Sequence, residues 1–195
     1  MKTKKALLIV DVQNDFCPRG ALAVPQGDEV VPVLNDYINL FQKKGWPIFA
    51  SRDWHPSKTK HFKNFGGLWP IHCVQNTNGA KFHPNLELPR DTIVLSKGMD
   101  PQTDSYSAFQ GLDDKGRPFL EILQAKGIAA LYVGGLATDY CVKSSVLDAR
   151  KNKFKVCLLM DAIRGVNLHP DDSHKATEEM VHQGAKKFNL EKLAV

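Results

Sequence analysis

The sequence predicts a three-layer, doubly wound α/β fold with a parallel sheet, and three observations support this. Five apolar runs have the length of strands and mostly do not alternate with polar residues, as in strands covered on both faces. They are residues 6–10, 47–51, 92–95, 129–133 and 155–160. Segments with helical periodicity lie between or after several of them, at residues 28–44, 117–126, 139–152 and 169–184. The 195 residues, 43% of them hydrophobic, suffice for one core, so we expect a single domain over residues 1–195.

The first two strands and the segment between them form one βαβ unit. Apolar residues recur at helical spacing from Val31 to Phe41, and Gly45 supplies a helix stop. Strands that alternate with helices favour a parallel sheet. In such sheets functional residues collect beyond the carboxyl ends of the strands.

Charge and composition argue against several classes of partner. The net charge is +5, but the lysines are scattered and no basic-aromatic motif occurs, so we expect no nucleic-acid partner. Asp11 ends the first apolar run after a few residues. The run is therefore too short for a signal sequence or a membrane span and predicts a strand. We expect no membrane partner and a cytoplasmic location. The oligomeric state stays open, and a homo-oligomer is possible.

The four cysteines form no C-x-x-C pair, and reduced thiols are expected.

A long segment, residues 52–90, breaks the alternation and is rich in His, Pro, Gly, Asn and Trp. Long irregular stretches in compact domains are more often functional than idle. Asp53 and His55 follow a predicted strand and lie two residues apart, so their side chains point to the same side. With His61 and His72 nearby, we predict a site for one divalent metal ion, and zinc, iron(II) and manganese all suit such ligands. His83 is equally consistent with an ordinary loop histidine.

Three titratable side chains follow the ends of three predicted strands. Asp11 can serve as a general base or merely cap a turn, and Lys97 can hold that carboxylate ionised or be a solvated lysine. Cys141 lies where a strand passes through a Gly-containing turn into a helix, whose dipole and free N–H groups would favour a thiolate and receive an oxyanion. The alternative is a buried, inert thiol, the better description of Cys157. Because three strand ends can meet, we predict that these side chains converge.

Four aromatic residues fall in loop segments near these positions: Phe16, Trp54, Trp69 and Tyr106. A flat aromatic substrate can stack among such side chains. For Trp54, a place in the core is at least as good an interpretation.

Six motifs occur in order along nearly the whole chain: LLIVDVQNDF, RDWHP, WPIHC, SKG, DSYSAF and GGLATDYCV. Together they make the chain resemble the isochorismatase-like cysteine hydrolase family, and within it the nicotinamidases (pyrazinamidases). The resemblance implies the isochorismatase-like hydrolase fold. It also implies an amidohydrolase that converts nicotinamide to nicotinate and ammonia in NAD salvage, with pyrazinamide as a related substrate.

The resemblance further implies roles for individual residues. Asp11, Lys97 and Cys141 would be the catalytic triad, with a thioester on Cys141 that water hydrolyses. The backbone N–H groups of Ala137 and Cys141 would receive the oxyanion, next to a cis Leu136–Ala137 bond.

The same resemblance assigns the metal ligands and the substrate pocket. Asp53, His55 and His72 would bind the ion, which holds the pyridine nitrogen of the substrate, while His61 would bind it directly or through water. Phe16, Trp69 and Tyr106 would line the substrate pocket.

Two rival hypotheses remain. One is an isochorismatase-family amidohydrolase acting on a carbamoyl compound, against which the predicted metal cluster argues. The other is a non-catalytic metal-binding protein of the same fold, which should have lost at least one of Asp11, Lys97 and Cys141, yet all three are present.

Overall fold

Six parallel strands form the central sheet of the computed structural model, which describes residues 4–192. In chain order they are β1 (Lys4–Val10), β2 (Ile48–Asp53), β3 (Ile93–Lys97), β4 (Ile128–Leu136), β5 (Lys155–Arg164) and β6 (Lys186–Phe188). Their order across the sheet is β3-β2-β1-β4-β5-β6, and each neighbouring pair is parallel. The α/β fold with a parallel sheet predicted from the sequence is confirmed.

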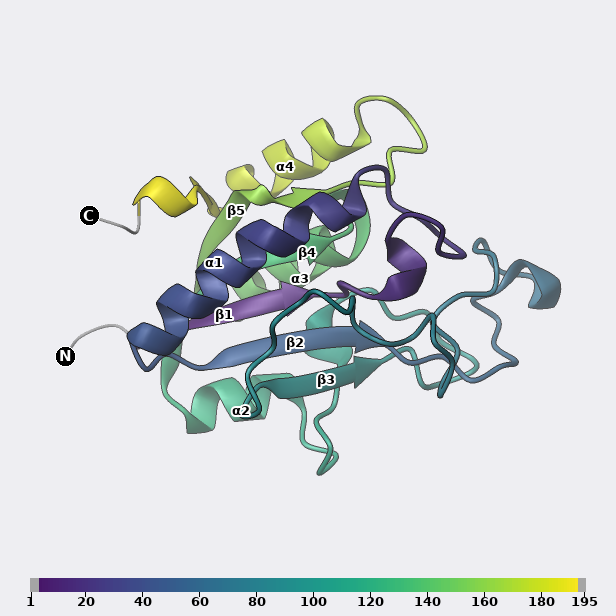
Figure 1. Ribbon diagram of the computed structural model, residues 1–195, viewed down its shortest axis with the longest axis horizontal. Helices are drawn as coiled ribbons and strands as arrows, with labels where there is room; N and C mark the ends of the chain where they lie inside the picture. Colours follow the sequence, from purple (N-terminus) through teal and green to yellow (C-terminus); the bar gives the residue numbers. More distant parts are fainter. Residues whose placement is uncertain (1–3, 193–195) are drawn as a thin grey trace.

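Helices cover both faces of this sheet. They are α1 (Val30–Lys43), α2 (Phe119–Ala125), α3 (Lys143–Lys151) and α4 (Asp172–His182). Leu7 and Ile9 of β1 pack in the cluster that contains α1, whereas Leu8 and Val10 pack in the cluster that contains α2 and α3. Alternate side chains of a strand point to opposite faces, so both sets are buried and the strand reads as one apolar run. Figure 1 shows α1 in front of the sheet and α3 behind it.

The end of α1 follows the predicted stop signal. Gly45 has φ +64°, its N–H donates to the Gln42 carbonyl, and the Trp46 N–H donates to the Phe41 carbonyl. This pair of hydrogen bonds satisfies carbonyls that a helix end leaves free. The chain then turns directly into β2.

Several boundaries differ from the sequence prediction. β6 was not predicted, because its three residues, KKF, form no apolar run. The helix predicted from residue 139 begins as a π-helical turn, Thr138–Val142, and continues as α3. β2 and β3 extend further than expected, so Asp53 and Lys97 are the last residues of their strands and do not follow them.

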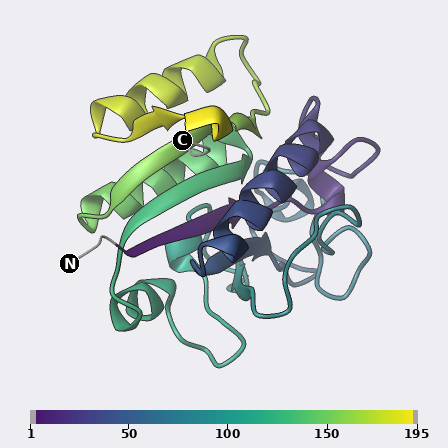
Figure 2. The same cartoon turned by 60° about the vertical axis from the view of Figure 1, so that its left-hand side comes forward.

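The topology places a crevice at one edge of the sheet. The strand order changes direction between β1 and β4, and ligands of doubly wound sheets bind at such a switch point, beyond the carboxyl ends. In Figure 1 the arrowheads of β1, β2 and β3 point toward the loops that follow β2. Figure 2 shows the same loops from a second side, together with the twist of the sheet and α4 on the side of β5 and β6. Within residues 4–192, none of the helices combines the length and apolar content needed to span a membrane.

Candidate active site and metal centre

The carboxyl edge of the sheet brings together the three titratable residues predicted to converge. Asp11 directly follows β1, Lys97 ends β3, and Cys141 lies in the π-helical turn after β4. Lys97 Nζ lies 2.9 Å from Asp11 Oδ2 and 3.5 Å from Cys141 Sγ, and it donates a hydrogen bond to Asp53 Oδ1. All four side chains are buried. The sequence did not predict that Asp53, a proposed metal ligand, also pairs with Lys97.

The charged side chains of this cluster shift one another's pKa values. Burial acts to lower the pKa of Lys97, but the Asp11 and Asp53 carboxylates outweigh it and raise that pKa well above its ordinary value. Burial acts to raise the pKa of Asp53, and the Lys97 ammonium reverses this, so the carboxyl stays ionised. For Asp11 burial prevails over Lys97, and its pKa is raised. An ionised Asp11 in this position is a base of increased strength.

The thiol of Cys141 differs from the sequence prediction in one respect. Burial, aided by the Asp11 and Asp53 carboxylates, raises the pKa of Cys141 well above its ordinary value, although Lys97 acts to lower it. This direction is opposite to the one expected from the helix dipole alone, because burial of the thiol prevails. The group is a thiol that needs a base. Asp11 Oδ2 is suited to that role, because within residues 4–192 it accepts no hydrogen bond of good geometry.

Two features fix Asp11 and Cys141 close together. Asp11 adopts φ +49°, and the Gln13 N–H closes the turn on the Asp11 carbonyl at 2.8 Å. Gly135, at φ +120°, lets β4 approach the end of β1, because a Cβ there would lie 2.1 Å from the Val10 oxygen.

The turn that carries Cys141 has the predicted backbone. The Leu136–Ala137 peptide bond is cis. The Ala137 carbonyl accepts hydrogen bonds from Tyr140 N (3.1 Å) and Val142 N (3.0 Å), so this oxygen is used inside the turn. Ala137 and Cys141 both line the pocket described below.

The predicted metal ligands form a second cluster beside the first. Ring nitrogens of His55, His61 and His72 lie within 4.8 Å of one another, and all three side chains are buried. Asp53 Oδ2 lies 3.6 Å from His55 Nε2 and 3.8 Å from His72 Nε2. Asp53 therefore faces Lys97 with one oxygen and the imidazoles with the other.

The cluster fits a metal ion. Each Nδ1 already has a partner: Gly98 O for His55 (3.0 Å), Pro70 O for His72 (2.7 Å) and Asp104 Oδ1 for His61 (2.8 Å). An Nδ1–H that donates leaves Nε2 with a free lone pair, as in metal-binding histidines. His55 Nε2 is buried and, within residues 4–192, has no hydrogen-bond partner. Burial also lowers the pKa of His61 and brings that of His72 to about 4, so both rings are neutral and able to bind a cation.

A neighbouring set of potential ligands does not fit an ion. Atoms of Asp11, Asp53 and Cys141 also lie within 4.8 Å of one another. The Lys97 ammonium contacts all three residues and supplies the positive charge there. His83 lies apart from the cluster and lines a separate hollow with Asp28 and Pro84.

Both clusters open onto one pocket. It is lined by Phe16, Leu22, Asp53, His61, Trp69, His72, Tyr106, Ala137, Tyr140, Cys141 and Val166. Trp69 donates from Nε1 to Tyr106 OH at 3.0 Å and meets Tyr140 edge-on. The three aromatic residues predicted to line a pocket are therefore present, whereas Leu22, Tyr140 and Val166 were missed. Trp54 is not in the pocket, because it lies under the Arg52 guanidinium, 3.8 Å from its ring centre.

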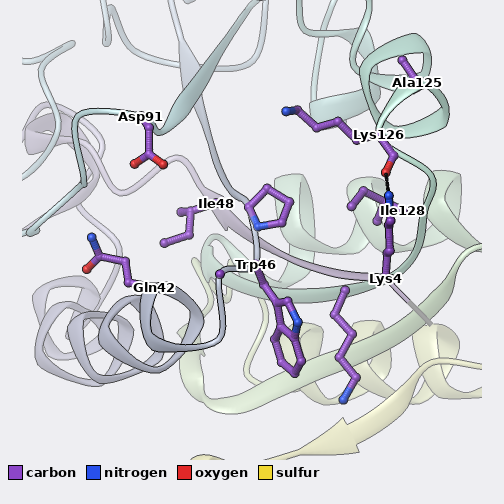
Figure 3. A pocket seen from close by; sticks show the side chains of 11 residues that line it. Lys4, Gln42, Trp46, Ile48, Asp91, Ala125, Lys126 and Ile128 are labelled. Atoms are coloured by element: carbon purple, nitrogen blue, oxygen red, sulfur yellow. Dashed lines mark hydrogen bonds between the residues drawn. The ribbon is translucent and has the colours of Figure 1, made fainter. Parts of the chain in front are cut away.

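A larger hollow lies at the opposite, amino-terminal edge of the sheet (Figure 3). Lys4 reaches the Lys126 carbonyl there, and Lys5 lies 4.7 Å from the centre of the Trp46 ring. These lysines stand near the C-terminal ends of α1 and α2, where cations are favoured. Among the described residues that line this hollow, there is no nucleophile or imidazole comparable to those at the carboxyl edge.

Comparison with known proteins identifies the family. Residues 5–191 match the family described as Isochorismatase domain. The chain is 44% identical to the nicotinamidase of Escherichia coli (strain K12), with 95% of each chain covered. It is 38% identical to a nicotinamidase/pyrazinamidase of Mycobacterium tuberculosis (strain ATCC 25618 / H37Rv), over 90% of this chain and 94% of that one. The chain belongs to the isochorismatase family.

Solved structures of similar proteins agree with this membership. The pyrazinamidase of Pyrococcus horikoshii in complex with zinc is 44% identical, with a TM-score of 0.88 and coverage of 96% of this chain and 99% of that one. A protein of L. infantum in complex with nicotinate is 34% identical, with a TM-score of 0.86 and coverage of 97% and 94%. The isochorismatase-like hydrolase fold inferred from the sequence is confirmed.

Several residues that build the site in this isochorismatase-family member were missed as such. Gln13 is buried and holds Asp53 by its backbone, accepting from N at 2.7 Å and donating to O at 2.8 Å. Ser51 donates to Asp11 Oδ1 at 2.7 Å, and Ser145 donates to the Cys141 carbonyl at 2.7 Å. The signal that could have found Ser51 is a hydroxyl at the end of the apolar run of residues 47–51.

Proposed function

We propose that this protein is a metal-dependent nicotinamidase that also accepts pyrazinamide, with Cys141 as nucleophile. The observation that carries the proposal is the shared pocket. A buried thiol with a base beside it faces the same aromatic-lined space as a carboxylate and two of the three clustered imidazoles. The similar proteins of Escherichia coli and Mycobacterium tuberculosis, a nicotinamidase and a nicotinamidase/pyrazinamidase, align with nearly the full chain. A carbamoyl compound would leave the imidazole side of the pocket without a partner.

The first half of the reaction uses Asp11 and Cys141. Asp11 takes the thiol proton as Sγ attacks the amide carbon, because the raised pKa of Cys141 leaves few thiolates at rest and that of Asp11 suits proton acceptance. The N–H groups of Ala137 and Cys141 receive the oxyanion. The proton on Asp11 then passes to the amide nitrogen, the C–N bond breaks, and ammonia departs. A thioester on Cys141 remains.

The second half regenerates the enzyme. Asp11 takes a proton from water as the water oxygen attacks the thioester carbon, and the C–S bond then breaks. The proton returns to sulfur, and the acid leaves. Lys97, 2.9 Å from Asp11 Oδ2, keeps that carboxylate ionised at the start of both halves.

Orientation of the substrate falls to the imidazole side of the pocket. Asp53, His55, His61 and His72 would hold a divalent ion, which when bound accepts the ring nitrogen of the substrate. Phe16, Trp69 and Tyr106 confine a flat ring between that side and Cys141. Pyrazinamide, which also has a ring nitrogen and a carboxamide, meets the same requirements.

Release of ammonia from nicotinamide by the purified, zinc-loaded protein tests the assignment. Wild type should release ammonia and nicotinate in equal amounts, and Cys141→Ala should release neither while still binding nicotinate in calorimetry. Mass spectrometry of acid-quenched wild type should detect an acyl adduct on Cys141. Wild type that binds nicotinamide but leaves it intact would refute the proposed activity.

A further inference from the structure

The three imidazoles of the metal centre are not held in the same way. His55 and His72 direct Nδ1 to the backbone carbonyls of Gly98 and Pro70. A carbonyl can only accept, so each ring carries its proton on Nδ1 and presents Nε2 to the site. At Gly98 the fit is tight, since a Cβ would lie 2.4 Å from His55 Cε1.

The partner of His61 is a side chain from another loop. His61 Nδ1 lies 2.8 Å from Asp104 Oδ1, and the two residues are 43 positions apart. The His61 side chain is buried, whereas that of Asp104 is 58% exposed. An exposed carboxylate therefore reaches in to the one ligand that the sequence left open.

The Asp104 backbone is anchored independently of this contact. The Asp104 carbonyl accepts from Gln110 Nε2 at 3.4 Å, and Gln110 Oε1 accepts from the backbone of Tyr106 and Ser107. A backbone hydrogen bond also attaches the loop of His61 to the loop of Asp104, because Lys60 N donates to Pro101 O at 3.0 Å. The contact thus joins two loops that are already in place.

We propose that Asp104 is the positioning residue of His61, holding its Nε2 toward His55 and His72 so that His61 binds the metal directly. The proposal rests on the metal site of the proposed function. A carboxylate acceptor fixes the tautomer as a carbonyl does, and its charge also strengthens the imidazole as a ligand. It is the one charged partner among the three Nδ1 contacts.

Zinc affinity tests this role directly. Dissociation constants for Zn²⁺ are measured by competition with a chromophoric chelator. Asp104→Ala should weaken binding ~10–100-fold, the range for loss of a partner of a metal-ligating histidine. Asp104→Asn should weaken it less, because the amide oxygen still accepts from Nδ1 but carries no charge.

Two controls separate positioning from loop structure. Asp100 lies in the same loop and is exposed, but it hydrogen-bonds only locally to Gln102 and Thr103, so Asp100→Ala should leave zinc affinity unchanged. In a His61→Ala background, Asp104→Ala should have no further effect. The visible absorption of the Co²⁺-loaded Asp104→Ala protein should shift toward that of His61→Ala.

Equal zinc affinity of wild type and Asp104→Ala would overturn the proposal. So would a loss of zinc affinity in Asp100→Ala as large as that in Asp104→Ala. The proposal would also fail if Asp104→Ala weakened zinc binding as much in the His61→Ala background as in the wild type. Because the readout is metal binding, failure here leaves ammonia release by the wild type untouched. Conversely, a wild type that binds zinc through Asp104 and His61 but releases no ammonia would refute only the proposed function.

Discussion

The ammonium of Lys97 lies between two carboxylates of different purpose, Asp11 and Asp53. It is 2.9 Å from Asp11 Oδ2, on the side of the thiol, and it donates to Asp53 Oδ1, whose other oxygen faces the imidazoles. One cation thus stabilises both the proposed base and a proposed metal ligand. Without it, two buried like charges would be adjacent, and one carboxyl would take up a proton.

Replacement of Asp11 should separate chemistry from binding. Asp11→Asn keeps the shape of the side chain but cannot accept a proton from Cys141. We expect kcat to fall by ~10²–10⁴-fold, the usual contribution of general acid–base catalysis, with the Kd for nicotinate nearly unchanged. Steady-state ammonia release and calorimetry measure the two quantities. A loss confined to binding would instead make Asp11 structural.

The pH profile should respond to Ser51. Its hydroxyl donates to Asp11 Oδ1 at 2.7 Å and acts to lower the pKa of that carboxyl, opposing the increase caused by burial. Asp11 acts ionised, so kcat/KM declines as pH falls through its pKa. Ser51→Ala raises that pKa and should move the acid limb to higher pH by about 1 unit, the equivalent of one hydrogen bond to a charged group.

Ser145→Ala is the matched control for that shift. Ser145 is also a buried serine in the site, but its hydroxyl donates to the Cys141 carbonyl and not to Asp11. The acid limb of the kcat/KM profile of Ser145→Ala should therefore lie at the same pH as that of the wild type. A Ser51→Ala profile that moved to lower pH would contradict the assignment of Asp11 as the base.

Metal removal should abolish activity reversibly. Protein stripped with a chelator should release no ammonia and recover with zinc, iron(II) or manganese. Zinc should also raise the Tm, because a ligand at 100 times its Kd stabilises the folded state by about 2.7 kcal/mol. In His72→Ala neither effect should appear at the same zinc concentration. Full turnover by demonstrably metal-free wild type would rule out the orienting role.

The sequence predicted the fold and the convergence of the catalytic residues because both follow from strand ends. Apolar runs report burial, and a parallel sheet brings the residues after Val10, near Leu95 and after Leu136 to one edge. Cys141 is the instructive exception. Its position was predicted correctly, but the direction of its pKa depends on how completely the thiol is buried and which carboxylates surround it.

Contacts between distant loops were the other part that the sequence could not provide. Ser51 and Gln13 act on residues 40 positions away, and Asp104 on one 43 positions away. Nothing in the local pattern around them encodes such pairings. β6 was not predicted from the sequence, because two of the three residues of this edge strand are lysines and form no apolar run.

Gln13 should prove to be a stability residue as well as a support for the site. Its side chain pairs the Asp53 N–H, the Asp53 carbonyl and the Ala80 carbonyl, all in the buried interior. Gln13→Met preserves length but leaves these three backbone groups without their partner. We expect a loss of about 2–4 kcal/mol in the free energy of unfolding, because an unpaired buried polar group costs ~1–3 kcal/mol. Urea denaturation measures it.

An exposed glutamine provides the comparison. Gln124 lies on the solvent side of α2, and Gln124→Met should change the free energy of unfolding by no more than about 0.5 kcal/mol. Zinc affinity should fall in Gln13→Met as well, since Asp53 is held through its own backbone, and should be unchanged in Gln124→Met. If Gln13→Met were as stable as Gln124→Met, water would have to replace Gln13 at the Asp53 backbone. Gln13 would then not be the residue that fixes the Asp53 carboxylate between Lys97 and the imidazoles.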